Sequence, residues 1–334
     1  MRTNGLKILA IAVMAIALSG PAVAQDEKFK GTIGTTLADS EQYWPEPVTP
    51  PEGAPNVLIW LIDDMGYGHS SAFGGLTPMP AIERLAENGL RYSNFHTTAL
   101  CSPSRAAIAA GRNHHNIGMG SHSLTAMGFP GYNAHPPDSA KGFSDILKNE
   151  GWSTMFLGKW DHTPQWESTF SGPFDRWPAG DGWEHFYGFM SGDMNNFNPI
   201  MWMEHTPVQP NYDQPGYHVN EDMADTAIRW ISMLRASAHK KPFVMFWATG
   251  AVHAPHQAPR DWVERFKGKF DMGYDKAREL ILANQIEMGI VPPGTNLSPR
   301  DEEIPAWETL NDQEKALYAR QMEAFAGQLA YSDF

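Results

Sequence analysis

Three apolar runs mark out the main body of the chain. Residues 56–62, 153–158 and 243–247 are rich in β-branched and large apolar side chains. Unbroken runs of this length are typical of strands that are buried on both faces of a sheet. The first run stops abruptly, so it would place Asp63 and Asp64 at the carboxyl end of a central strand.

Helical spacing fills most of the intervals between these runs. Apolar residues recur at three- and four-residue spacing in residues 80–90 and 141–150. A shorter helix is expected over 104–110, opened by Pro103, and Asn220 could cap a longer amphipathic one. This alternation of helix and strand predicts an α/β fold with a mostly parallel central sheet and helices on both faces.

Three other segments lack that alternation. Residues 25–55 are polar and then Pro-rich, which predicts an N-terminal arm. Residues 160–199 are dense in Trp, Phe, Gly and Asp without a sustained period, so a long functional loop region is expected there. Residues 271–334 look largely helical, and their last helix has no stop signal. We therefore expect a globular domain over 56–334 that is incomplete at its C-terminus.

The first 24 residues have the pattern of a signal peptide. Two basic residues precede the apolar run 8–18, and Ala22-Val23-Ala24 offers a small-residue cleavage site. A membrane anchor is the alternative, but the run is too short to span a bilayer and no stop-transfer pattern follows. This predicts export, most simply to a periplasm, without a stable membrane anchor.

Composition narrows the class of protein. A chain of 334 residues with 42% apolar positions can bury a substantial core. Its formal net charge of −13 and the lack of a basic patch argue against nucleic acid as a partner. The chain has one cysteine, Cys101, so disulfides cannot hold it together in an oxidising compartment.

Two short segments carry candidate chemistry. The adjacent carboxylates of Asp63 and Asp64 could supply oxygen ligands to Ca²⁺ or Mg²⁺, although an ordinary solvated turn would look the same. Cys101 precedes a Pro-started helix with Arg105 one turn in, where backbone N–H groups and a guanidinium favour an anion. The alternative is that Cys101 is a buried free thiol without a chemical role.

At this point the sequence resembles a known family, the type I or formylglycine-dependent sulfatases of the alkaline phosphatase superfamily. Cys101-Ser102-Pro103-Ser104-Arg105 is similar to their Cys-x-Pro-x-Arg signature, and Asp63-Asp64 to their first metal-binding strand. The matches run in the family's order from about residue 56 to the end. Further matches are Gly158-Lys159-Trp160, residues 249–256 and, for the long bacterial arylsulfatases, residues 113–115, 128–132 and 173–178.

The resemblance implies an alkaline-phosphatase-like sandwich whose C-terminal part is missing, and an aryl sulfate ester as substrate. It implies that a maturase oxidises Cys101 to formylglycine, whose hydrate attacks sulfur through one hydroxyl. The alcohol leaves, and the second hydroxyl then loses its proton and expels sulfate. A divalent cation, Ca²⁺ or alternatively Mg²⁺, would be held by Asp63, Asp64 and the modified Cys101.

The resemblance also assigns roles to basic side chains. Arg105 would hold the formylglycine hydroxyl, while Lys159 and His253 would bind sulfate oxygens or protonate the leaving group. Each of these two would otherwise be an ordinary surface or loop residue. The family's histidine two positions after the lysine is replaced here by Asp161, followed by His162. A carboxylate would repel a sulfate ester, so His162 is the expected substitute.

Two alternatives to a sulfatase stay open on the sequence. The second possible activity, implied by the same superfamily, is hydrolysis of phosphonate monoesters or phosphodiesters. An inactive anion-binding fragment is the third, because the family's later metal ligands lie beyond Phe334. We therefore expect weak activity or none from the 334-residue chain itself.

Overall fold

The computed structural model describes residues 29–334, and the expected signal peptide over residues 1–24 lies outside them. The chain separates into two compact units, residues 1–48 and 49–334. In the described part of the first unit, Thr32 and Glu41 form an antiparallel bridge around a single 3₁₀ turn, Leu37–Asp39. No helix within residues 29–334 has the length and apolar character needed to cross a membrane.

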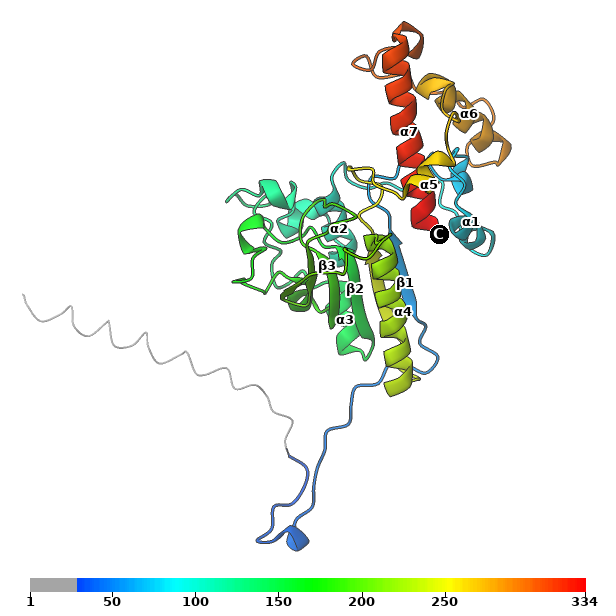
Figure 1. Ribbon diagram of the computed structural model, residues 1–334. Coiled ribbons are helices and arrows are strands. Elements are labelled where there is room, and N and C mark those ends of the chain that lie inside the picture. The colour runs from blue at the N-terminus through cyan, green and yellow to red at the C-terminus, as the bar shows by residue number, and fades with distance from the viewer. Residues whose placement is uncertain (1–28) are drawn as a thin grey trace, which may run out of the picture. The chain divides into compact units, whose positions relative to one another are not determined.

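The second unit is built on a six-stranded sheet in the order β1-β6-β2-β3-β4-β5 (Figure 1). The first four strands in that order are parallel, and the last two pair antiparallel as a short hairpin. The strands are β1 Val57–Leu61, β2 Ser153–Lys159, β3 His185–Phe189, β4 Met201–Met203, β5 Thr206–Val208 and β6 Phe243–Ala248. The predicted α/β fold with a mostly parallel sheet is confirmed.

Helices cover both faces of the sheet. On one face Phe156 and Phe246 pack with side chains of α2 and α3, and on the other Leu157 and Met245 pack with α4, which runs alongside the strands in Figure 1. Successive residues of a strand point to opposite faces, which explains this division. The helices are α1 Pro80–Glu87, α2 Cys101–Ala110, α3 Phe143–Asn149, α4 Val219–Ser237, α5 Arg260–Glu264, α6 Gly273–Glu287 and α7 Asp312–Asp333.

Burial along the strands corrects one prediction. Every residue of β2 is buried, as expected for a strand covered on both faces. Within the described residues, however, β1 lies at an edge of the sheet and its Leu58 is 59% exposed. The expectation of a central strand before Asp63 is therefore wrong, because β6 and β2 occupy the middle of the sheet.

Three other local predictions are also wrong. The segment 160–199 was expected to be loop, but it contains β3, whose aromatic residues pair in parallel with β2. The short helix begins at Cys101 and not at Ser104, so Pro103 lies within its first turn, where a missing N–H costs nothing. The longer helix is capped by His218, whose side chain accepts a hydrogen bond from the backbone N–H of Asn220.

The C-terminal helices pack against the loop that follows β6. Leu329 of α7 joins Ala251 and Val252 of that loop in a buried cluster. The carboxylate of Asp333 accepts hydrogen bonds from the backbone N–H groups of Ala81, at 2.7 Å, and Ile82, at 3.0 Å. Asp333 therefore satisfies the N-terminus of α1 and supports the fold.

Candidate active site

The carboxyl edge of the parallel sheet gathers the candidate residues. Lys159 is the last residue of β2, and Asp63 follows β1 by two positions. The loop after β6 is tied to Asp63 by two backbone hydrogen bonds, from Asp63 N to Ala251 O at 2.8 Å and from Val252 N to Asp63 O at 2.6 Å. Parallel strands end at the same edge, so residues far apart in sequence meet there.

Close backbone packing precedes Lys159. Gly158 has φ +95°, and a Cβ at this position would lie 1.9 Å from the carbonyl oxygen of Ala248. Only glycine can therefore bring β2 this close to β6. This approach fixes the end of β2 and, with it, the position of Lys159.

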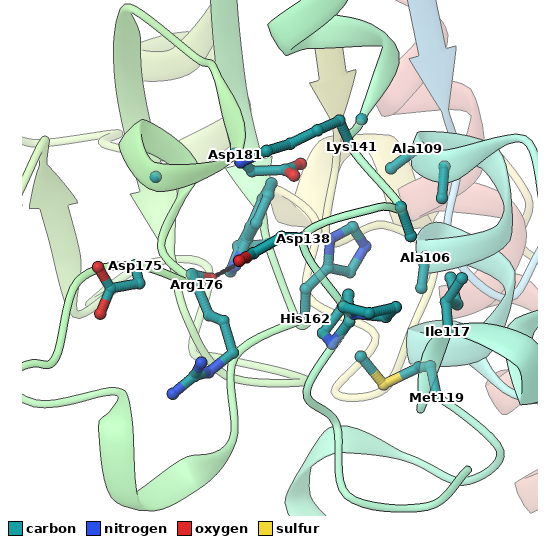
Figure 2. Close-up of a pocket in the computed structure, with 17 residues that line it drawn as sticks. Ala106, Ala109, Ile117, Met119, Asp138, Lys141, His162, Asp175, Arg176 and Asp181 are labelled. Atoms are coloured by element: carbon teal, nitrogen blue, oxygen red, sulfur yellow. Dashed lines mark hydrogen bonds between the residues drawn. The ribbon is translucent and has the colours of Figure 1, made fainter. Parts of the chain in front are cut away.

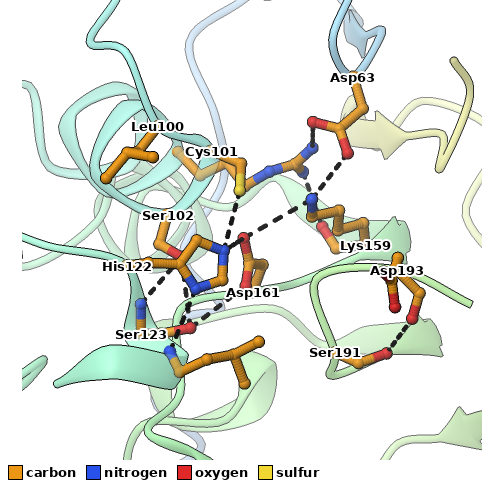
Figure 3. Close-up of polar contacts among 12 residues, drawn as sticks. Asp63, Leu100, Cys101, Ser102, His122, Ser123, Lys159, Asp161, Ser191 and Asp193 are labelled. Carbon is orange, nitrogen blue, oxygen red and sulfur yellow. Dashed lines mark hydrogen bonds and ion pairs between the residues drawn. The ribbon is translucent and has the colours of Figure 1, made fainter. Parts of the chain in front are cut away.

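A buried cluster of ion pairs joins Asp63, Arg105 and Lys159, of which Asp63 and Lys159 are labelled in Figure 3. Lys159 Nζ lies 2.7 Å from Asp63 Oδ2, and Arg105 Nη2 lies 3.1 Å from Asp63 Oδ1. Arg105 also donates to the carbonyl oxygen of Lys159 at 2.9 Å. One carboxylate therefore faces two cations, and Lys159 Nζ has Asp161 Oδ2 as a second, more distant partner at 3.7 Å.

Cys101 is the first residue of α2, and its thiol contacts a histidine that the sequence did not indicate. The Nε2 atom of His122 lies 3.0 Å from Cys101 Sγ and 3.3 Å from Asp161 Oδ2. These three side chains converge in Figure 3, and their ligand atoms all lie within 4.8 Å of one another. The site therefore contains a nucleophilic residue, a histidine and a carboxylate in mutual reach.

Serine hydrogen bonds dock the His122 loop onto α2. Ser123 N donates to Ser102 Oγ at 3.1 Å, and Ser102 Oγ donates to Ser123 Oγ at 3.3 Å. Ser123 Oγ in turn donates to Asp161 Oδ1 at 3.2 Å. Since Ser102 is adjacent to Cys101, this chain of bonds sets the distance between His122 and the thiol.

The pKa values of His122 and Asp161, the two residues beside the thiol, are both shifted by their interactions. The hydrogen bond to Asp161, followed by the one to Cys101, raises the pKa of His122 to about 10. Burial raises the pKa of Asp161, but the hydrogen bond from His122 and the charge of Lys159 outweigh it, so the net pKa lies below its ordinary value. Asp161 is therefore ionised at neutral pH.

The structure separates His162 from this cluster. Its ring packs on Trp160 with centroids 4.3 Å apart and faces a cavity of about 100 Å³ (Figure 2). Burial, followed by the charge of Arg105, lowers the pKa of His162 to about 3, so the ring is neutral. Asp161, rather than His162, is the residue that reaches Lys159 and the thiol's partner, with 3.7 Å between Lys159 Nζ and Asp161 Oδ2.

The same cavity is also bordered by Asp181, an acidic residue whose pKa is raised. Asp181 lines its wall together with Lys141 (Figure 2). Burial raises the pKa of Asp181 to about 7, and the charge of Lys141 opposes this shift only in part. The carboxyl group therefore titrates near neutral pH.

His253 lies beside the more exposed aspartate. Its Nε2 is 3.7 Å from Asp64 Oδ2, and its Nδ1 lies 2.6 Å from the carbonyl oxygen of Ala254. Asp64 adopts φ 56°, a left-handed conformation, and its side chain is exposed, whereas Asp63 is buried. The pair Asp64 and His253 forms the solvent-facing side of the site.

The donor chemistry fits a hard divalent cation at Asp63 and Asp64. Both residues offer carboxylate oxygens, the ligands that Ca²⁺ and Mg²⁺ prefer. The two oxygens of Asp63 are each engaged by a cation, but a carboxylate oxygen has two lone pairs, so each can accept a second partner. Cys101 contacts His122 instead of these aspartates.

These features define an α/β protein with a nucleophile-centred, cation-lined site at the carboxyl edge of its sheet. The chain belongs to the sulfatase family, because the family profile named Sulfatase matches residues 55–334. It is 29% identical over 287 residues to an arylsulfatase of Klebsiella aerogenes, covering 84% of this chain and 60% of that protein.

Other relatives agree with this assignment. An uncharacterized sulfatase of Schizosaccharomyces pombe is 29% identical over 301 residues, covering 84% of this chain and 52% of that protein. The chain thus spans about half the length of such relatives. The crystal structure of yidJ from Bacteroides fragilis shares the fold, with a TM-score of 0.62 at 16% identity over 87% of this chain and 58% of that one.

Proposed function

We propose that the protein hydrolyses sulfate esters and that Cys101 is the precursor of its nucleophile. The observation that carries this proposal is the position of Cys101, in the first turn of α2 beside His122 and Asp161 and next to a cationic cluster. A nucleophile at this place can reach an anion that the cluster attracts. Membership of the sulfatase family makes a sulfate ester the anion to test first.

Conversion of Cys101 to formylglycine by a separate maturase would supply a hydrated aldehyde as the nucleophilic group. Its advantage over a thiol is that the second hydroxyl can release the bound sulfate without attack by water. Arg105 is buried beneath residue 101 on α2 and would help to hold this group. A cation held by Asp63 and Asp64, Ca²⁺ or alternatively Mg²⁺, would supply further positive charge.

Two basic side chains would act on the ester itself. Lys159, fully buried and paired with Asp63, would bind a sulfate oxygen. His253 is exposed enough to exchange protons and would protonate the departing alcohol. His162, the fourth basic residue expected from the sequence, would act only indirectly, by packing on Trp160 behind the cluster.

The substrate and its location are part of the same proposal. An aryl body is the first choice, in keeping with the arylsulfatase of Klebsiella aerogenes among the relatives. The leader pattern over residues 1–24 supports a periplasmic or secreted enzyme. Formylglycine formation would make the maturase an obligatory partner.

Turnover of matched esters tests the proposal. The chain is co-expressed with a maturase, and nitrophenyl sulfate and nitrophenyl phosphate are compared with Ca²⁺ present. Any turnover by this chain is expected to be weak; we expect it to have a higher kcat/KM for the sulfate and to be lost completely in Cys101→Ala. A higher kcat/KM for the phosphate would favour a phosphorus ester hydrolase. Turnover that is unaffected by Cys101→Ala would contradict the proposal.

A further inference from the structure

The direction of the His122 ring is fixed by a backbone contact on its far side. The N–H of Leu124 donates to His122 Nδ1 at 3.2 Å. A neutral histidine carries one ring proton, so a ring that accepts at Nδ1 carries its proton on Nε2. The imidazolium form, which the raised pKa favours, also has a proton on Nε2, although its second proton on Nδ1 would replace the bond from Leu124. The atom that faces Cys101 is therefore a hydrogen-bond donor in both charge states.

Asp161 offers a complementary acceptor at the same place. Its side chain is fully buried, and Oδ1 already accepts from Ser123. Oδ2 lies 3.3 Å from His122 Nε2 and 3.7 Å from Lys159 Nζ, so both contacts are long and this oxygen can accept a further, closer donor. A buried carboxylate oxygen with spare lone pairs is costly unless a donor reaches it. A hydroxyl at residue 101 would be such a donor.

A metal ion is the competing occupant of these three side chains. Thiolate, imidazole and carboxylate are all zinc ligands, and the three ligand atoms are close enough for one ion. A metal bound to Nε2 would require that nitrogen to be bare and would move the ring proton to Nδ1. That tautomer would lose the hydrogen bond from Leu124, so the observed contacts favour a hydroxyl.

We infer that His122 and Asp161 together hold one hydroxyl of the formylglycine hydrate, His122 by donating to its oxygen and Asp161 by accepting its proton in a hydrogen bond. The inference rests on the proposed function. Both hydroxyls are on one carbon, so fixing one directs the other towards the cationic cluster of Asp63, Arg105 and Lys159. His122 is thus a catalytic residue that touches the nucleophilic group and orients it.

Two substitutions of His122 distinguish donation from proton transfer. The amide of His122→Gln offers an N–H near the position of Nε2 but cannot act as an acid or base, whereas His122→Leu offers no donor. We expect kcat of the glutamine variant within about 10-fold of the parent, and a loss of about 10²–10³-fold for leucine, the effect of removing one such donor. KM should change little in either. His115→Leu, which changes an exposed histidine of the preceding turn, is the matched control.

The same variants can overturn the inference. If glutamine is as inactive as leucine while both melt within a few degrees of the parent, His122 transfers a proton and the inference is wrong. If leucine keeps full activity, His122 does not touch the nucleophile. Equal losses in the His115 control would show that the effect is not specific to His122.

Nuclear magnetic resonance separates this inference from the proposed function. In the chain with unmodified Cys101 and ¹⁵N-labelled histidine, long-range proton–nitrogen correlations report which ring nitrogen is protonated, and His122→Gln assigns the signal. We expect a proton on Nε2; a bare Nε2 with a proton on Nδ1 would overturn the donor role. A protonated Nε2 in a protein whose turnover is unaffected by Cys101→Ala would instead contradict the proposed function and leave the donor assignment standing.

Discussion

Replacement of Asp63 by asparagine should destabilise the protein more than any other single change at the site. Asp63 is 5% exposed and contacts two buried cations, Lys159 at 2.7 Å and Arg105 at 3.1 Å. Without its charge, both cations remain buried, and the nearest described carboxylate oxygen to Lys159 is that of Asp161 at 3.7 Å. Removing one partner of a buried ion pair costs about 3–5 kcal/mol, because the other charge stays uncompensated.

Lys159→Met is the matched substitution from the other side of the pair. Asp63 would then keep Arg105 as its partner, so this variant leaves no carboxylate alone. We expect it to cost less than Asp63→Asn, about 1–3 kcal/mol. The double variant should be more stable than the sum of the two single effects predicts, because the uncompensated lysine is gone.

Urea unfolding followed by tryptophan fluorescence measures these differences. Asp63→Asn should lower the midpoint with an unchanged m-value, which indicates a change in stability and not in compactness. A loss below about 1 kcal/mol would refute the reasoning, since the pair would then behave like a solvent-exposed one. If Lys159→Met lowers the free energy of unfolding more than Asp63→Asn does, the predicted order of the two effects is wrong.

Three further predictions concern separate residues. Burial holds the pKa of Asp181 at about 7 against an ordinary 3.8, so the folded state keeps a proton that the unfolded state loses, and stability falls as pH rises from 4 to 7. Asp181→Asn should therefore stabilise the protein by about 2 kcal/mol at pH 8 and hardly at all at pH 4; equal effects at both would contradict this. His162→Gln should lower kcat/KM by less than about 10-fold, because the neutral ring lies behind the cluster; a loss beyond about 10²-fold would restore it as a catalytic acid or base. His253→Ala should reduce kcat by about 10²–10⁴-fold for esters with poor leaving alcohols and less for nitrophenyl sulfate; equal losses would remove its role as an acid.

The sequence predicted the strands that carry the site, but not all of the sheet. Unbroken apolar runs revealed β1, β2 and β6 because they contrast with the polar segments beside them. β3 was missed, since its residues His185–Phe189 lie in a region where aromatic and glycine residues are dense throughout. Only parallel pairing with β2 distinguishes them. The edge position of β1 is likewise a property of strand order, which no local pattern contains.

The site shows the same division between local and tertiary information. The motif around Cys101 and Arg105 is contiguous, so its presence at a helix start could be predicted. His122 lies in a short polar segment with no periodic or spacing signal. It reaches the thiol only because Ser123 docks on Ser102, a contact between residues 21 positions apart. The sequence disfavours Asp161 as a site residue because a carboxylate repels sulfate. The positive charges of His122 and Lys159 that offset it lie beside it only in the folded chain.

Mass spectrometry of the tryptic peptide over residues 92–105 tests the central claim most directly. The chain is expressed with a formylglycine-generating maturase, and the peptide that contains residue 101 is compared with its calculated mass. The account predicts a peptide about 18 Da lighter than the cysteine form, or its hydrate, because the thiol has become an aldehyde. An unmodified thiol in the presence of a maturase that converts a control sulfatase would contradict it.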